Sequence, residues 1–339
     1  MRFDALWVNG VSGESGDLVS VADAVAAGHY RADDIAETKM RSVSVLDVPA
    51  PEAAVTAGAA ALTAGVAEGA PSPSFLIHSY TFFQGISMWP TGCWIANQLF
   101  GADSAIVPFE LTAYSNSMIF ALATAGRMLA GDPAVASSIL LTCADRFTAP
   151  GVDRWTLSSG MVFGDGAAAA LVSNVPGRYQ VLSVELGADA GMEPLFRGDE
   201  GHSSIPAPVD MRARNRAFFR KGELSPAQVR ARAAAGVRSV VSKAIAQAGI
   251  ERSEIAWVIP PFVGERMFNE SFVEPLWDFS DSSVLDLGLR HGHMGPVDQM
   301  FALHHLEQSG QLLRGRCVLF IGTGFGFTFS AAVLRVAAA

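Results

Sequence analysis

The sequence predicts a layered α/β fold in which helices and sheets alternate in five layers and two halves share one design. Its 339 residues are too many for one small core, yet no stretch resembles a linker between independent domains. Half of the residues are apolar and only 17% are charged, so much of the chain must be buried. The same order of predicted elements also occurs twice along the chain.

The first half, taken as residues 1–174, opens its series of elements with an Ala-rich helix. Apolar runs and the turn residues between them define the elements that follow. In chain order we expect a helix over 51–68, a buried strand over 74–79, a helix from about Ser117, a buried strand over 138–145 and an apolar strand over 167–173.

The second half, residues 175–339, repeats that order. Ser225 followed by Pro226 is a typical helix start, because serine caps the first N–H groups and proline needs none there. The runs SILLTCAD and RCVLFIGTG are continuously apolar, as strands covered by helices on both faces require. The expected elements are a helix over 226–248, a strand over 255–260, a helix from Pro296, a strand over 317–322 and a strand over 327–335.

Composition narrows the class of protein. The N-terminus MRFDALWVNG lacks the features of a secretory signal, and the Ala-rich helix lacks the large apolar side chains of a membrane span, so a cytoplasmic location is expected. Cys93, Cys143 and Cys317 are spaced too widely for a zinc site or a disulfide framework, and no metal is expected. A net charge of −9 argues against general nucleic-acid binding.

The segment FELTAYSNSMIFAL, residues 109–122, contains the candidate nucleophile. An extended stretch ends at small polar residues and a helix follows, which places Ser115 at a strand-to-helix turn. At such a turn the positive end of the helix dipole and free backbone N–H groups favour both a nucleophile and an oxyanion. From the residues alone, the alternative is that Ser115 or Ser117 merely caps the helix.

This segment resembles the nucleophile motif of ketosynthase III proteins, a branch of the thiolase superfamily, with Ser115 in place of their catalytic Cys. Three later stretches agree with the family in the same order: MVFGDGAAAALVS (161–173), RHGHMG (290–295) and GFGFTFSAAVLR (324–335). The resemblance implies a thiolase-like five-layered αβαβα fold made of two duplicated halves. It is greatest to serine-containing acyltransferases, such as the starter-unit acyltransferase of daunorubicin-type polyketide biosynthesis.

A serine nucleophile needs an adjacent base, because a hydroxyl is hardly ionised at neutral pH. His293 stands where the family's HGN motif has its catalytic Asn, and Asp298 lies five residues further on, in the first turn of the next helix. Ser115, His293 and Asp298 are therefore predicted to act as nucleophile, general base and orienting acid. The alternative is that Asp298 only favours the helix dipole and that His293 is a packed core histidine.

Decarboxylative condensation is expected to be feeble. Condensing members of the family stabilise an enolate with a His and an Asn, and here Pro261 and His293 stand at those positions. Proline cannot donate a hydrogen bond, and one such donor is typically worth ~3 to 4 kcal/mol in the transition state. Acyl transfer needs only an activated nucleophile and an oxyanion hole, which the resemblance assigns to the backbone N–H groups of Ser115 and Phe325.

The resemblance also implies substrates and partners. The expected donor is a coenzyme A or phosphopantetheine thioester, with no separate cofactor, and the expected assembly is a homodimer. Carrier proteins are acidic, so a net-negative enzyme needs a local basic face to receive one. Arg266 matches a docking position of the family, and Arg212 and Arg216 lie in the basic stretch MRARNRAFFRKGE, which alternatively is only a solvated helix face.

Several functions remain open at this point. The first is an acyltransferase that moves a short acyl group through Ser115 to an acyl carrier protein, in an acyl pocket limited by Tyr114, Met118 and Phe325. The second is transfer to the hydroxyl of a sugar or another small molecule. An inactive ketosynthase-like structural partner and a residual condensing enzyme are further alternatives.

Overall fold

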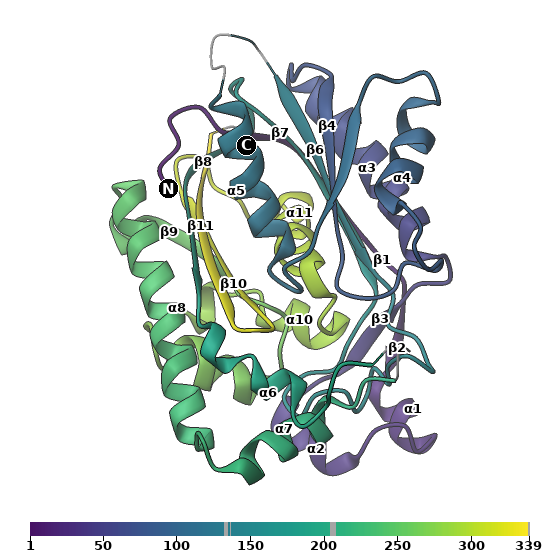
Figure 1. Ribbon diagram of the computed structural model, residues 1–339. Coiled ribbons are helices and arrows are strands. Elements are labelled where there is room, and N and C mark those ends of the chain that lie inside the picture. Colours follow the sequence, from purple (N-terminus) through teal and green to yellow (C-terminus); the bar gives the residue numbers. More distant parts are fainter. Residues whose placement is uncertain (132–134, 136, 204–207, 338–339) are drawn as a thin grey trace.

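The structure of the chain is a computed structural model, which describes residues 1–131, 135, 137–203 and 208–337. Its helices and strands stack in five layers (Figure 1). One outer layer is α8 (Pro226–Ala248), and the other contains α3 (Ala50–Ala67) and α4 (Thr91–Phe100). Between the two β layers lie α5 (Ser117–Leu129) and α11 (Asp298–Gln308). The predicted αβαβα arrangement is confirmed.

A single nine-stranded sheet supplies both β layers. Across the sheet the strand order is β5 (Val107–Leu111), β4 (Pro73–Ser79), β6 (Ser138–Asp145), β7 (Gly166–Ser173), β1 (Trp7–Ser15), β8 (Tyr179–Ala188), β11 (Thr328–Val336), β10 (Cys317–Gly324) and β9 (Ile255–Ile259). β1 pairs with β7 along its whole length but with β8 only through Trp7 and Val8. The two groups of strands therefore diverge at β1 and enclose the middle helices between them (Figure 1).

Shorter elements complete the chain outside these layers. They are α1 (Val21–Ala26), α2 (Ala32–Thr38), α6 (Pro194–Arg197), α7 (Met211–Lys221), α9 (Glu265–Phe268), α10 (Leu285–His291), and the two-stranded sheet of β2 (Asp17–Ser20) and β3 (Ser42–Val45). Among the described helices, none is both long and apolar enough to cross a membrane.

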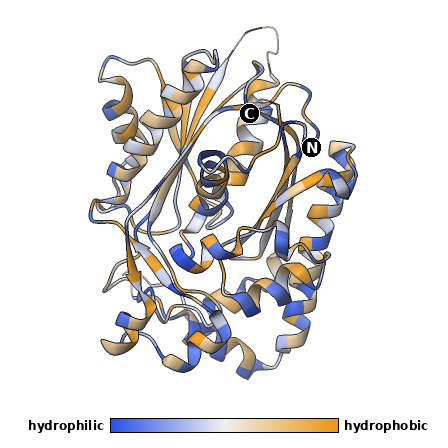
Figure 2. Cartoon of the chain, turned by 180° about the vertical axis from the view of Figure 1, so that it is seen from behind, coloured by the Kyte–Doolittle hydropathy of each residue, from blue (hydrophilic) through white to orange (hydrophobic). Residues whose placement is uncertain are grey.

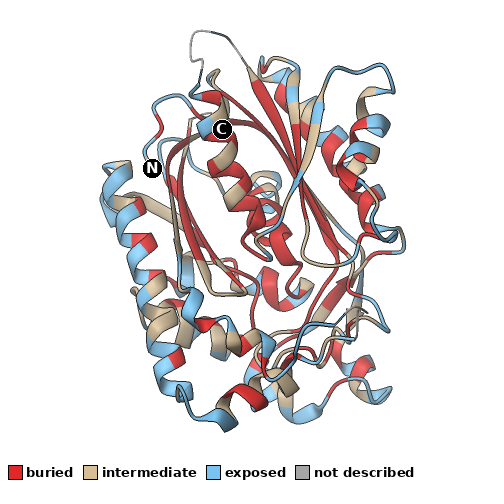
Figure 3. Cartoon of the chain, viewed as in Figure 1, coloured by how far each residue is buried: buried red, intermediate tan, exposed pale blue. Residues whose placement is uncertain are grey.

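The most deeply buried helices are those of the middle layer. α5 and α11 are buried around most of their circumference, whereas α8 buries one face and exposes the other (Figure 3). The hydropathy colours agree, because the outer helices show alternating apolar and polar residues (Figure 2). β6 and β7, which are sandwiched between helices, are buried at every residue, as the continuous apolar run of β6 predicts.

Most predicted boundaries agree with the structure to within two residues. α8 spans the predicted 226–248, and its N-cap Ser225 forms a reciprocal capping box with Gln228. The helix expected from Pro296 begins with the short 3₁₀ turn Gly295–Val297 and continues as α11 only from Asp298. The proposed division between the halves, after residue 174, falls in the connection from β7 to β8.

Candidate active site

The candidate nucleophile lies in a tight turn between β5 and α5. Tyr114, directly before Ser115, adopts a left-handed conformation with φ of 53°, which is unusual for a bulky residue. The hydroxyl of Ser117 accepts a hydrogen bond from the N–H of Ala113 at 2.7 Å and donates to the carbonyl of Tyr114 at 2.6 Å. The N-cap residue of α5 is Asn116, and its side chain makes no capping bond. Ser117 thus holds the turn, and the Ser115 hydroxyl is directed elsewhere.

Ser115, His293 and Asp298 form a continuous chain of hydrogen bonds. The Ser115 Oγ lies 2.7 Å from Nε2 of His293, and Nδ1 of His293 lies 2.6 Å from Oδ2 of Asp298. Because the carboxylate accepts from Nδ1, Nε2 is free to accept the proton of the serine hydroxyl. All three side chains are buried, with residue exposures of 7%, 3% and 0% in that order.

The Asp298 carboxylate is fully satisfied by its surroundings. Besides the imidazole, it accepts the N–H of Phe262 at 2.8 Å and the N–H of Met294 at 2.9 Å. Three donors compensate a buried carboxylate for the water that it has lost. Its position at the start of α11 also places it at the positive end of the helix dipole.

Backbone hydrogen bonds between the two glycine-rich motifs fix the position of His293. The N–H of His293 donates to the carbonyl of Val162 at 2.8 Å, and the N–H of Gly164 donates to the carbonyl of His293 at 3.0 Å. A Cβ at Gly164 would lie 1.9 Å from the backbone oxygen of His291, so only glycine permits this approach. The ring of Phe163 packs edge-on against the imidazole, with ring centroids 5.3 Å apart.

The acidic residue of the FGDG motif, Asp165, is structural. Its buried carboxylate accepts the N–H groups of Leu46 at 3.1 Å and Phe147 at 2.8 Å, and pairs with the guanidinium of Arg154 at 2.9 Å. Leu46 follows β3, whereas Phe147 and Arg154 belong to the connection between β6 and β7, so Asp165 ties two segments together and fixes the loop that positions His293. The sequence offers no signal for Arg154, because its contact forms only in the folded chain.

Ser115 and His293 open onto a cavity of about 250 Å³, here called the Ser115 cavity. Pro261, Met267 and Phe325 are among its lining residues. Pro261 thus faces the reacting atoms, at the position from which condensing relatives are expected to present a histidine. Phe325 lies in the turn between β10 and β11. Of the side chains expected to limit an acyl pocket, Met118 is completely buried and lines neither this cavity nor the second one described below.

A groove at the surface adjoins the Ser115 cavity and shares Arg230, Ala234 and Glu270 with it. Arg230 and Arg238 lie two helical turns apart on α8, and both line the groove. Neither guanidinium has a hydrogen bond or an ion pair to any described residue. Arg266 also lines the groove, but it pairs with Glu37 at 3.1 Å and Glu270 at 2.9 Å.

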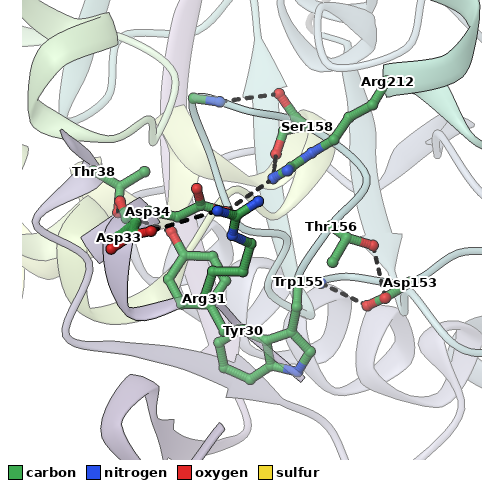
Figure 4. A network of polar contacts seen from close by, with 11 residues as sticks. Tyr30, Arg31, Asp33, Asp34, Thr38, Asp153, Trp155, Thr156, Ser158 and Arg212 are labelled. Carbon is green, nitrogen blue, oxygen red and sulfur yellow. Dashed lines mark hydrogen bonds and ion pairs between the residues drawn. The ribbon is translucent and has the colours of Figure 1, made fainter. Parts of the chain in front are cut away.

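The basic stretch occupies α7 and is largely neutralised by acidic neighbours. Arg212 points inward, where it donates to the carbonyl of Ser158 at 2.7 Å and pairs with Asp34 at 3.4 Å (Figure 4). Arg216 lies 4.0 Å from the carboxylate of Asp210 and is exposed. Neither arginine lines the groove at the mouth of the Ser115 cavity. Arg212 therefore acts in the structure as a link between α7 and α2.

Two family models match the two segments of the chain that carry the site residues. Residues 109–190 match the family model for 3-oxoacyl-[acyl-carrier-protein (ACP)] synthase III, and residues 245–336 match the model for its C-terminal part. The beta-ketoacyl-[acyl-carrier-protein] synthase III of Chlamydia caviae is 24% identical over 250 residues, which cover 73% of this chain and 72% of that protein.

Solved structures extend the similarity to nearly the whole chain. The acyltransferase ChlB3 is 30% identical, with 98% of each chain covered and a TM-score of 0.89. The synthase FabH of Pseudomonas aeruginosa has a TM-score of 0.77 at 19% identity, covering 98% of this chain and 99% of that one. The second likeness is one of fold and identifies the architecture as thiolase-like.

Proposed function

The chain belongs to the 3-oxoacyl-[acyl-carrier-protein] synthase III family of transferases, and we propose that it is a non-condensing acyltransferase that carries its acyl group on Ser115. The observation that carries the proposal is the hydrogen-bonded chain from Ser115 through His293 to Asp298. This series of hydrogen bonds supplies the base that a serine nucleophile needs. A cysteine nucleophile would need no such base. Similarity to the acyltransferase ChlB3 supports the same class of reaction.

The reaction proceeds in two half-reactions. In the first, Ser115 Oγ attacks the carbonyl carbon of a thioester while Nε2 of His293 takes the hydroxyl proton. The tetrahedral intermediate collapses, the C–S bond breaks, and the leaving thiol receives that proton. In the second, an acceptor thiol or hydroxyl gives its proton to His293 and attacks the ester, and Ser115 regains a proton. The backbone N–H groups of Ser115 and Phe325 are the proposed oxyanion donors.

Condensation is the less favoured reaction for this site. A proline ring at 261 offers no donor to an enolate oxygen, and the imidazole of His293 is already committed to Ser115 and Asp298. The proposed donor is a short acyl group carried as a thioester on coenzyme A or on a carrier protein. An acyl carrier protein is the proposed acceptor, which would make the enzyme a starter-unit loader in polyketide biosynthesis.

We propose that an acidic carrier protein docks at the groove beside the Ser115 cavity. Arg266 lines that groove, and Arg230 and Arg238, which have no ion pair with any residue that the structure describes, have charge to spare for a phosphate or a carboxylate. Arg212 and Arg216 lie outside the groove, and we assign them a secondary role at most. Arg238→Glu should slow transfer to a holo carrier protein far more than acylation by coenzyme A thioesters, because Arg238 lines the groove but not the Ser115 cavity.

A homodimer is also part of the proposal. β5 is an edge strand, so its outer N–H and C=O groups are open to pairing with another strand. Val107 of β5 is exposed, and the exposed side chains of Phe83, Ile86 and Met88 line one hollow together with residues of β5. A soluble monomer rarely exposes such a cluster, and a second copy would cover it.

Intact-mass measurement tests the proposed function directly. The purified protein is incubated with a panel of acyl-coenzyme A thioesters, and a mass gain equal to the acyl group is expected. The gain should vanish in Ser115→Ala and persist in Ser72→Ala, which alters an exposed serine that does not line the Ser115 cavity. Acceptor screens with a holo carrier protein and with glycosides then decide the acceptor. A folded protein that gains no mass from any donor would favour the structural-partner alternative instead.

A further inference from the structure

Asp145 is a buried acidic residue that the proposed reaction does not use. It is the last residue of β6, and its side chain is completely buried. Burial raises the pKa of its carboxyl group to about 8, although hydrogen bonds from the backbone N–H groups of Phe82 and Thr81 oppose that shift. Because burying a carboxyl group is unfavourable and an apolar side chain could fill the same space, stability alone does not account for Asp145.

The carboxyl group of Asp145 holds the segment that follows β4. Its Oδ1 accepts the N–H of Phe82 at 2.7 Å, and the N–H of Thr81 lies 3.0 Å from Oδ1 and 2.8 Å from Oδ2. Thr81 and Phe82 line a second cavity, of about 400 Å³, which shares part of its lining with the Ser115 cavity. Asp145 itself lines neither cavity and therefore supports the site from behind.

The same carboxyl group packs against the segment that joins His293 to Asp298, here called the 293–298 segment. An added Cβ at Gly295 would lie 2.4 Å from Oδ2 of Asp145 and 3.0 Å from Oγ1 of Thr81. The backbone of Gly295 therefore rests directly on both side chains. Its φ of 65° is left-handed, so glycine suits this position in conformation as well as in size.

Neighbouring contacts hold the 293–298 segment against the ends of the same two strands. Sγ of Cys143, also on β6, donates to the carbonyl of Pro296 at 3.6 Å. A Cβ at Gly166, the first residue of β7, would lie 2.6 Å from Sδ of Met294. The segment that carries the base and its orienting acid is thus seated on the ends of β6 and β7.

We propose that Asp145 is a positioning residue for His293, because its carboxyl group clamps the 293–298 segment against the segment that follows β4. This inference rests on the proposed acyl-Ser115 function, for which His293 must keep its hydrogen bonds to Ser115 and Asp298. Asp145 acts through the place of the imidazole and not on the substrate. A misplacement of about 1 Å at a reacting group can lower the rate on the order of a hundredfold.

Single-turnover acylation of Ser115, followed by intact mass over a range of acyl-coenzyme A concentrations, tests the proposal. Asp145→Ala should lower the maximal rate about ten- to a hundredfold and leave the half-saturating donor concentration unchanged. Asp145→Asn should lose clearly less, because an amide oxygen can accept both N–H groups, as Oδ1 does. In the Ser115→Cys background the loss in Asp145→Ala should be smaller, since a thiol depends less on the base.

Gly295→Ala tests the same contact from the opposite side. Its methyl group would overlap Oδ2 of Asp145, so it should slow acylation in the otherwise wild-type protein. In the Asp145→Ala background the overlapping atom is gone, and the same substitution should slow acylation much less. The strain of alanine in a left-handed conformation is common to both backgrounds and cancels in the comparison. Equal slowing in both backgrounds would contradict the proposed clamp.

Ser183→Ala is the control for the loss of a buried polar group. The hydroxyl of Ser183 is completely buried, donates to the carbonyl of Ala244 at 2.7 Å, and lines neither cavity. The variant should acylate at the wild-type rate. If Asp145→Ala also acylates at the wild-type rate, the positioning role is wrong, while acylation itself would still support the proposed function.

A spectroscopic measurement keeps the inference testable even if no donor acylates the protein. The NMR chemical shifts of the His293 ring nitrogens, in protein that contains isotope-labelled histidine, report the tautomer and the hydrogen bonds of the ring. The two shifts are assigned by their absence in His293→Gln. They should move in Asp145→Ala and Gly295→Ala and stay in place in Ser183→Ala, which would uphold the positioning of the imidazole although the acyl-Ser115 function failed. Unmoved shifts in folded Asp145→Ala protein would overturn the inference.

Discussion

Asn116, the residue after the candidate nucleophile, is buried and ties the nucleophile turn to β11. Its Nδ2 donates to the hydroxyl of Thr328 at 3.1 Å, and its Oδ1 accepts from the hydroxyl of Ser330 at 2.5 Å. The amide thereby braces the backbone that carries Ser115 against the opposite layer. A small displacement of a nucleophile lowers the reaction rate markedly, because the reacting atoms must approach one another in a narrow range of distances and angles.

Asn116→Ala should therefore slow acylation of Ser115 about tenfold or more while hardly changing the donor concentration at half-maximal rate. Single-turnover mass measurements over a range of donor concentrations separate the two quantities. Thr124→Ala, on the same helix, is the control, since among the described residues its hydroxyl bonds only the helix backbone at Phe120. An increase in the half-maximal concentration at unchanged rate would show that Asn116 serves binding and not positioning.

Asp298 is expected to act through His293 rather than on the substrate. Asp298→Asn preserves the shape of the side chain but can present an N–H to Nδ1, which favours the wrong imidazole tautomer. Acylation of Ser115 should fall by about 10²- to 10⁴-fold. In the Ser115→Cys background the loss should be clearly smaller, because a thiol is partly ionised without help from a base. Equal losses in both backgrounds would contradict the assigned roles.

The site residues differ in how far the sequence could predict them. His293 and Asp298 lie five positions apart at the start of a helix, so their contact follows from local geometry, and the hydrogen bond between them is present. Ser115 could be connected to His293 only through the family resemblance, because 178 positions separate them. No sequence pattern indicated the role of Asn116, because its hydrogen-bond partners belong to a strand near the other end of the chain.

At the scale of elements, β1 shows why some strands escaped prediction. Its sequence WVNGVSGES contains two glycines and three serine or acidic residues, which lower its apparent strand character, yet it lies near the middle of the sheet. Close packing at Gly10 explains why a strand in the middle of the sheet contains a glycine. α3 packs so closely over β1 that a Cβ at Gly10 would lie 2.2 Å from the backbone oxygen of Ala61. The glycine is required by the packing of two layers, which no local pattern reveals.

Gly10→Ala should consequently destabilise the fold by about 3 kcal/mol, because the clash is with helix backbone that cannot rotate away. Urea unfolding of the wild type and the variant measures the change. Gly58→Ala on α3 is the comparison, since its added methyl would meet the flexible end of Leu99 at 2.9 Å and alanine favours a helix. If both variants lost the same stability, close packing of α3 on β1 would not be the cause.

At the scale of the whole molecule, the exposed apolar cluster beside β5 predicts self-association. Met88 is fully exposed and Ile86 is 59% exposed, although a second copy could bury both. Met88→Arg combined with Ile86→Glu should shift the protein toward monomer in sedimentation velocity at micromolar concentration. Leu313→Arg is the control, because Leu313 is 62% exposed but lies far along the chain in the loop before β10. A wild-type protein that sediments as a monomer would dispose of the homodimer proposal.

The fold also buries titratable groups whose charge must change when the chain unfolds. Burial lowers the pKa of His78 from 6.5 to about 4, and its ring nitrogens lie 3.0 Å from the hydroxyl of Thr142 and 3.3 Å from the amide oxygen of Gln84. Burial likewise raises the pKa of Asp145 from 3.8 to about 8, against the opposing effect of backbone N–H donors from Thr81 and Phe82. Each shift makes stability depend on pH, with opposite signs.

For His78 the unfolded chain binds the extra proton, so its contribution is complete above about pH 6.5 and is lost as the pH falls toward about 4. For Asp145 the folded chain holds the extra proton, so its contribution is complete below about pH 4 and is lost as the pH rises toward about 8. The contributions of His78 and Asp145 to the free energy of unfolding change with pH in opposite directions below pH 6.5. Above pH 6.5 only the contribution of Asp145 still changes.

The test is to measure the free energy of unfolding in urea at pH 5, 6.5 and 8. In the wild type it should fall between pH 6.5 and 8. His78→Gln, which cannot titrate, should gain stability between pH 6.5 and 5, where the wild type should gain less or lose some, whereas the fall between pH 6.5 and 8 should be similar in both proteins. A variant that followed the wild-type curve at all three values would mean that His78 is not held neutral by burial.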